Sequence, residues 1–138
     1  MGRISVLAIL MSAALGGCGG SDEDQIRDAY VDFAEAFADA DGEKVCDMLT
    51  RAGKRDVVAA GVVVGGGGDC PRTVKSLARL FDNGDLTALR EAKVTKVTID
   101  KDRAVVQGTA NLDENAKPTQ LRKVEGEWLI DADAKDAS

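Results

Sequence analysis

Apolar residues in the first third of the chain recur with the spacing of one face of an α-helix. Ser21 is a suitable N-cap, Asp24 takes the capping-box position, and the acids around them favour the positive end of a helix dipole. The apolar positions that follow lie three or four residues apart: Ile26, Ala29, Tyr30, Phe33 and Phe37. We therefore predict a helix that continues to about Ala40 and is broken at Asp41 and Gly42.

Two further helical faces follow this first helix. One contains Cys46 and has its apolar positions at Val45, Leu49, Ala52 and Val57. After the glycine run 65–68, Pro71 suits a first helical turn. The apolar positions of this third helix are Val74, Leu77, Ala78 and Phe81. Asn83 and Gly84 are predicted to end it.

Beyond Lys93 the apolar positions alternate with polar ones, which is typical of β-strands. Asp102 is predicted to turn the chain, and Glu125–Gly126 is a plausible hairpin turn. The predicted strand segments are centred on Val97 and Ile99, on 104–112, on 118–124 and on 128–130. Helices followed by neighbouring strands indicate an α+β fold, in which N-terminal helices pack on an antiparallel sheet.

The first fifteen residues have the features of an export signal. Arg3 supplies a basic flank, and an apolar run of twelve residues extends from Ile4 to Leu15. A membrane-spanning helix needs about 20 apolar residues, so this run is too short to be one. A buried core helix is the alternative, but a basic flank and small residues after the apolar run favour a signal peptide.

The four residues Leu15-Gly16-Gly17-Cys18 resemble the lipobox of bacterial lipoproteins. In that family the cysteine receives a diacylglycerol and becomes the first residue of the mature protein. The resemblance implies a signal peptide over 1–17, an acylated Cys18 and a short tether over 18–23. It also implies that the protein is exported and anchored by lipid to the cell membrane, on the extracytoplasmic side.

The chain has three cysteines, and an odd number in an exported protein leaves one thiol to be explained. If Cys18 carries lipid, Cys46 and Cys70 remain, and an oxidising compartment would join them in a disulfide. A metal site or a reactive thiol is the competing interpretation. Neither cysteine has a CxxC partner and the chain has no histidine, so the sequence favours the disulfide.

Charge restricts the possible partners. The net charge is -6, and removing 1–17 with Arg3 leaves 24 acids against 17 bases, or -7. Such a protein lacks the basic surface that nucleic acid requires, so we expect no nucleic-acid partner. An anionic membrane would also repel it, so we expect attachment through the lipid on Cys18. The absence of histidine excludes histidine-dependent catalytic triads.

Several segments together resemble small exported bacterial proteins of the nuclear transport factor 2-like, or cystatin-like, fold. They are the helix IRDAYVDFAEAFADAD, the segments VCDMLT and DC, and the closing LRKVEGEWLI. The resemblance implies one domain over 24–132, followed by a tail over 133–138. It implies a curved antiparallel sheet wrapped around a long helix, forming a cone with an apolar pocket. Enzymes, ligand binders and dimerising modules all use this fold, so it does not specify a function.

Four aromatic residues are candidates to line such a pocket: Tyr30, Phe33, Phe37 and Trp128. Each is also explained by ordinary core packing. Isomerases of the resembled superfamily pair a tyrosine with pocket carboxylates, but no acid can be matched to Tyr30. We therefore predict no catalytic residue.

No metal site or cofactor is predicted either. The glycine run 65–68 lacks the Gly-Lys-Ser/Thr ending of a phosphate loop. The acidic segment before Cys46 lacks the decisive ligands of a calcium loop, because Phe37 and Met48 fall at those positions.

The sequence favours a noncatalytic, membrane-tethered domain that binds a small apolar ligand, a peptide or a protein partner. A small pocket enzyme of the isomerase or dehydratase type is the alternative. A homodimer formed through the exposed face of the sheet is compatible with both hypotheses.

Overall fold

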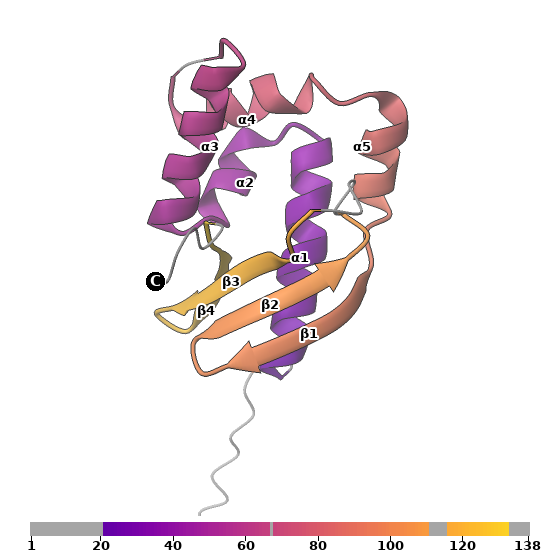
Figure 1. The fold of residues 1–138 in the computed structure, drawn as a ribbon, viewed down its shortest axis with the longest axis vertical. Coiled ribbons are helices and arrows are strands. Elements are labelled where there is room, and N and C mark those ends of the chain that lie inside the picture. The colour runs from indigo at the N-terminus through magenta and orange to yellow at the C-terminus, as the bar shows by residue number, and fades with distance from the viewer. Residues whose placement is uncertain (1–20, 67, 111–115, 133–138) are drawn as a thin grey trace, which may run out of the picture.

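The computed structural model of the chain describes residues 21–66, 68–110 and 116–132. The predicted signal peptide, Cys18 and the tail 133–138 lie outside these residues. Five helices precede four strands in the described chain, as Figure 1 shows. The elements are α1 (Asp22–Ala38), α2 (Gly42–Asp47), α3 (Arg51–Val63), α4 (Cys70–Ala78), α5 (Asn83–Arg90), β1 (Val94–Asp100), β2 (Arg103–Gly108), β3 (Thr119–Val124) and β4 (Glu127–Ile130). The predicted α+β class is confirmed.

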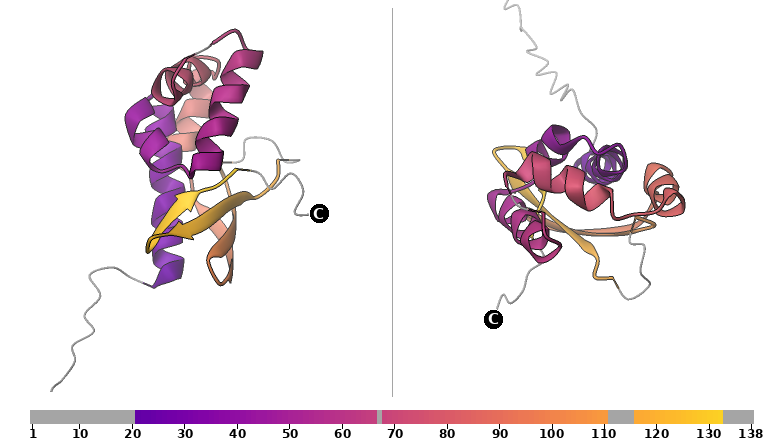
Figure 2. Two further views of the ribbon diagram at one scale, coloured as in Figure 1. Left: turned by 90° about the vertical axis from the view of Figure 1, so that its left-hand side faces the viewer. Right: turned by 90° about the horizontal axis from the view of Figure 1, so that it is seen from above.

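Helix α1 forms where the helical spacing predicted it. The Ser21 hydroxyl caps it by accepting a hydrogen bond from the Asp24 backbone N–H at 3.3 Å. Ala40, with φ of 54°, turns the chain out of the helical conformation just beyond its end. One part of α1 lies behind the sheet and the other lies among the remaining helices, so this helix joins the two layers (Figures 1 and 2).

The prediction of one continuous second helix is wrong. The chain leaves the helix after Asp47 and starts α3 at Arg51, with Thr50 as its N-cap. Between the two helices, the Met48 carbonyl accepts from the Ile130 N–H and the Thr50 N–H donates to the Ile130 carbonyl, both at 2.8 Å. These bonds give hydrogen-bond partners to the backbone N–H and carbonyl of Ile130 on the outer edge of β4. Because the chain at Met48 and Thr50 pairs with β4, the helix is interrupted here.

The prediction that Asn83 and Gly84 end helical structure is also wrong. Helix α4 ends at Ala78, and Asn83 opens a further helix, α5, that the sequence did not predict. Asp82 caps α5 by accepting a hydrogen bond from the Asp85 N–H at 2.8 Å. Asp82 is therefore the N-cap of a new helix, at the point where the sequence predicted that a helix would end.

The four strands form one antiparallel sheet in the order β1-β2-β3-β4. Glu125 and Gly126 both have positive φ, 51° and 84°, and they connect β3 to β4 as predicted for this hairpin. The inward-facing side chains come from alternate positions, as expected for a sheet with one covered face. The buried ones are Ala104, Val106, Leu121, Trp128 and Ile130.

Strand β2 ends at Gly108, earlier than the predicted end at Leu112, which lies outside the described residues. A Cβ atom at position 108 would lie 2.6 Å from both the Tyr30 hydroxyl and the Lys93 carbonyl. Glycine at this position allows α1 and the residue just before β1 to approach the strand closely.

The helices cover one face of the sheet and one end of it, which Figure 2 shows from two sides. Helix α4 packs against α2 and α3, and α5 packs against α1. Side chains from both layers meet in one core that includes Ile26, Val45, Val74 and Leu121. A groove lies where α3 and α4 approach the end of the sheet.

Candidate functional site

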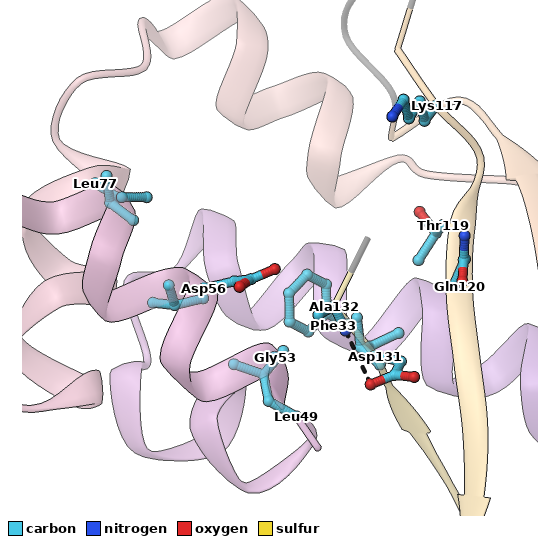
Figure 3. A pocket seen from close by; sticks show the side chains of 13 residues that line it. Phe33, Leu49, Gly53, Asp56, Leu77, Lys117, Thr119, Gln120, Asp131 and Ala132 are labelled. Carbon is cyan, nitrogen blue, oxygen red and sulfur yellow. Dashed lines mark hydrogen bonds between the residues drawn. The ribbon is translucent and has the colours of Figure 1, made fainter. Parts of the chain in front are cut away.

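A groove of about 370 Å³ lies between the helices and the end of the sheet where β4 finishes. Figure 3 shows its lining side chains. They come from α1, α3, α4, the start of β3 and the end of β4, and from the segments next to these. The lining residues are Phe33, Leu49, Gly53, Asp56, Val57, Ala60, Leu77, Lys117, Thr119, Gln120, Ile130, Asp131 and Ala132.

Helix α3 supplies one wall of the groove through positions three and four residues apart. Gly53, Asp56, Val57 and Ala60 therefore share a face of the helix. A Cβ atom on Gly53 would lie 3.0 Å from the Ile130 carbonyl, so glycine allows the helix to approach β4 closely. Helical spacing predicted Val57 as an apolar position of a helix, and no pattern in the sequence pointed to Asp56 or Ala60.

A polar contact fixes the start of α3 against the end of the sheet. The Thr50 hydroxyl donates to Asp131 Oδ1 at 2.6 Å and accepts from the Gly53 N–H at 3.1 Å. Asp131 Oδ1 also accepts from the Ala132 N–H at 3.0 Å, the bond drawn in Figure 3. Asp131, the residue that follows β4, is therefore linked to the start of α3.

The groove has an apolar floor and a polar margin. Phe33, Val57 and Leu77 are half-buried and come from three different helices. Asp56 and Lys117 are exposed, and Figure 3 shows the Asp56 carboxylate directed into the space beside Phe33. Such a surface can bind the apolar part of a ligand, and its exposed charged side chains can contact the polar groups of that ligand.

No known protein family, curated protein or solved structure matches this chain.

Of the four aromatic residues predicted as pocket lining, Phe33 lines this groove. Tyr30 is buried, with 2% of its surface exposed, and its hydroxyl accepts a hydrogen bond from the Ala110 N–H at 2.9 Å. Phe37 packs edge to face against Phe81, with ring centroids 5.5 Å apart. Tyr30 and Phe37 thus lie in packing contacts outside the lining of the groove.

Trp128 contacts the first residue of α1 and does not line the groove. Its indole donates to Asp22 Oδ1 at 3.1 Å, and Lys123 Nζ contacts the same oxygen at 2.8 Å. Lys123 also lies over the indole ring, 5.8 Å from its centroid. Trp128 borders a separate shallow depression together with Gln25 and Asp32.

This contact lowers the pKa of Asp22. Hydrogen bonds from Lys123 and then from Trp128 hold the pKa of the Asp22 carboxyl below its ordinary value, because they stabilise the ionised form. Desolvation of Asp22 acts in the opposite direction and is the weaker effect.

Cys46 and Cys70 form a disulfide that links α2 to the first residue of α4, with Cα atoms 6.1 Å apart. The predicted pairing of these two cysteines is present in the structure. Gly42 lies where a Cβ atom would collide with the Pro71 backbone, so the two helices are in close contact next to the bridge.

Within the described residues, no helix is both long and apolar enough to cross a membrane. The same residues contain no group of three or more cysteine, aspartate and glutamate side chains arranged to hold a metal ion.

Proposed function

We propose that this protein is a membrane-tethered, extracytoplasmic domain that binds a small, mostly apolar ligand without chemical conversion. The observation that carries the proposal is the groove with Phe33, Val57 and Leu77 on its floor. Its volume of about 370 Å³ is in the range typical of small-molecule sites. Asp56 and Lys117 would orient the ligand from the margin.

The position of Tyr30 supports binding over catalysis. An isomerase-like mechanism would need the Tyr30 hydroxyl and a carboxylate to meet on the pocket surface. The hydroxyl instead accepts a hydrogen bond from Ala110, and the groove carboxylate of Asp131 is bonded to Thr50 and Ala132. Tyr30 does not line the groove, so its hydroxyl and the Asp131 carboxylate do not meet on one pocket surface.

The membrane tether rests on the lipobox-like residues Leu15–Cys18. The Cys46–Cys70 disulfide supports export, because such bonds persist in oxidising compartments. It also leaves Cys18 as the cysteine available for acylation. Two or three acyl chains on that residue would hold the domain stably at the bilayer.

We further propose that the fold is a compact relative of the cone-shaped nuclear transport factor 2-like fold. The long helix α1 behind an antiparallel sheet, and a groove where the helices approach the end of that sheet, support the proposal. A crystal structure with a flat sheet, or with a groove filled by side chains, would argue against it.

Native mass spectrometry of the protein purified from its own host tests the ligand hypothesis. We expect a reproducible small-molecule adduct on the wild type that is lost from Ala60→Glu, which adds a carboxylate one turn from Asp56 in the groove. Ala59→Glu is the matched control, since Ala59 is exposed on the same helix but does not line the groove. Equal adducts on all three proteins would refute binding in the groove.

A further inference from the structure

A second pocket, of about 430 Å³, lies beside the start of α3 on the outer face of the sheet. Arg122 and Leu129 are register partners on β3 and β4, and they face away from the buried Leu121. The pocket is lined by Leu49, Thr50, Arg51, Ala52, Arg55, Arg122, Val124, Leu129 and Asp131. It shares Leu49 and Asp131 with the groove but is otherwise made of different residues.

Three of these residues are arginines, which we call the arginine triad: Arg51, Arg55 and Arg122. Arg51 is the first residue of α3 and Arg55 lies one helical turn later; the first turn of this helix contains no acid. Cations are disfavoured near a helix N-terminus, so local helix stability does not explain their position. Their concentration is unusual in a chain with a net charge of -6.

The arginine triad has no counter-ion within the described part of the chain. None of its members forms an ion pair there, whereas Arg27, Arg72 and Arg90 each do. Among the same residues, the buried Nε of Arg122 also has no hydrogen-bond partner. A buried Nε–H group in this state lacks the acceptor that normally offsets its desolvation.

The sheet register places a second cation directly opposite Arg122. Its partner on β2 is Arg103, and its partner on β4 is Leu129. The acid in this row of the sheet is Asp100, which is opposite Arg103 and not opposite Arg122. Like charges at directly opposite positions are destabilising. One carboxylate, Asp131, lines the pocket, and it already accepts hydrogen bonds from Thr50 and Ala132.

The chemistry of the pocket fits a phosphate group. Arginine presents paired N–H donors that match two phosphate oxygens, so three guanidinium groups can surround one such anion. Val124 and Leu129 add apolar surface beside the charges. A phosphate ester with a small apolar part would use both features.

We propose that the arginine triad binds a phosphate group, carried either by a soluble phosphate compound or by the headgroup of a phospholipid. The bound anion would offset the positive charge that the three guanidinium groups bring to the pocket and would reduce the repulsion between Arg122 and Arg103. This site is distinct from the groove, and the proposal does not depend on the groove having a ligand.

Calorimetric titration at constant ionic strength tests the proposal on the full chain in a nonionic detergent. The probes are inorganic phosphate and dihexanoyl phosphatidic acid below its micellar concentration. We expect saturable binding of at least one probe, and a preference between the two identifies the source of the phosphate group. Loss of one charge-assisted contact in Arg55→Gln or Arg122→Gln should weaken binding about tenfold or more.

Arg79→Gln is the matched control, because Arg79 is exposed just beyond the end of α4 and does not line the pocket. Arg55 is also exposed, so its variant keeps the test valid if Arg122→Gln fails to fold. Two results would overturn the proposal: no saturable binding of either probe, or equal weakening by Arg55→Gln and Arg79→Gln.

Discussion

The indole Nε1 of Trp128 donates a 3.1 Å hydrogen bond to the carboxylate of Asp22, which lies 106 positions earlier in the chain. Asp22 is the first residue of α1, and Trp128 is on β4. Lys123, across the β3–β4 hairpin from Trp128, donates to the same oxygen at 2.8 Å. The start of the longest helix is therefore fixed to the last hairpin of the sheet.

Asp22→Asn is expected to lower the stability of the domain and to reduce its pH dependence in acid. Because contacts lower the pKa of Asp22 in the folded state, its contribution is complete above its unfolded pKa of about 3.9. That contribution is lost as the pH falls through the folded pKa. The difference in unfolding free energy between wild type and variant should be greatest at neutral pH and should shrink below about pH 4. Urea denaturation followed by circular dichroism measures it.

Asp24→Asn is the control for this experiment. Asp24 is in the same helical turn, so its loss has a similar effect on the helix dipole. If both variants change the unfolding free energy equally at every pH, the contact with Lys123 and Trp128 does not stabilise the fold.

Removing the disulfide with the double substitution Cys46→Ala and Cys70→Ala should destabilise the domain. The two cysteines are separated by 24 residues, and a loop of that length corresponds to roughly 3 kcal/mol in the chain-entropy model. Guanidinium denaturation gives the value, and dithiothreitol treatment of the wild type should produce a similar loss. Mass spectrometry that finds both thiols free in the exported protein would contradict the prediction.

Tyr30→Phe should affect stability and leave ligand binding unchanged. The substitution removes the acceptor of the Ala110 N–H, and an unsatisfied group of this kind costs about 1–2 kcal/mol. The aromatic ring still fits against Gly108. Thermal unfolding and native mass spectrometry measure the two properties separately. A variant of normal stability that has lost its small-molecule adduct would show that the hydroxyl contacts ligand, contrary to our proposal.

Cys18→Ser should abolish acylation and release the protein from the membrane fraction. The reason is that a serine hydroxyl does not replace the thiol in diacylglycerol transfer. Incorporation of radiolabelled fatty acid and membrane fractionation measure the two effects. Cys46→Ser is the control that leaves the lipobox-like residues intact, and wild-type labelling of the Cys18→Ser protein would refute the assignment.

Local signals in the sequence were sufficient for much of the fold. Helical spacing and the Ser21 cap predicted α1, and alternation of apolar residues predicted the strands. Glu125–Gly126 predicted the hairpin because glycine readily adopts the positive φ that such a turn requires. Local periodicity failed between Asp47 and Arg51, where hydrogen bonds to Ile130 interrupt the helix. Contacts between residues this far apart in the sequence leave no periodic pattern of apolar residues from which they could be predicted.

The sequence by itself determined the α+β class, the first helix, the strand order along the chain and the pairing of Cys46 with Cys70. These follow from periodicity, capping and cysteine parity, which act over short distances or depend only on counting. Only the tertiary structure decided which side chains share a surface. It separated Phe33 from Tyr30 and Trp128, and it brought Arg122 beside Arg51 and Arg55. The reason is that α3 meets the end of the sheet through contacts between residues some 80 positions apart, such as Thr50 with Asp131.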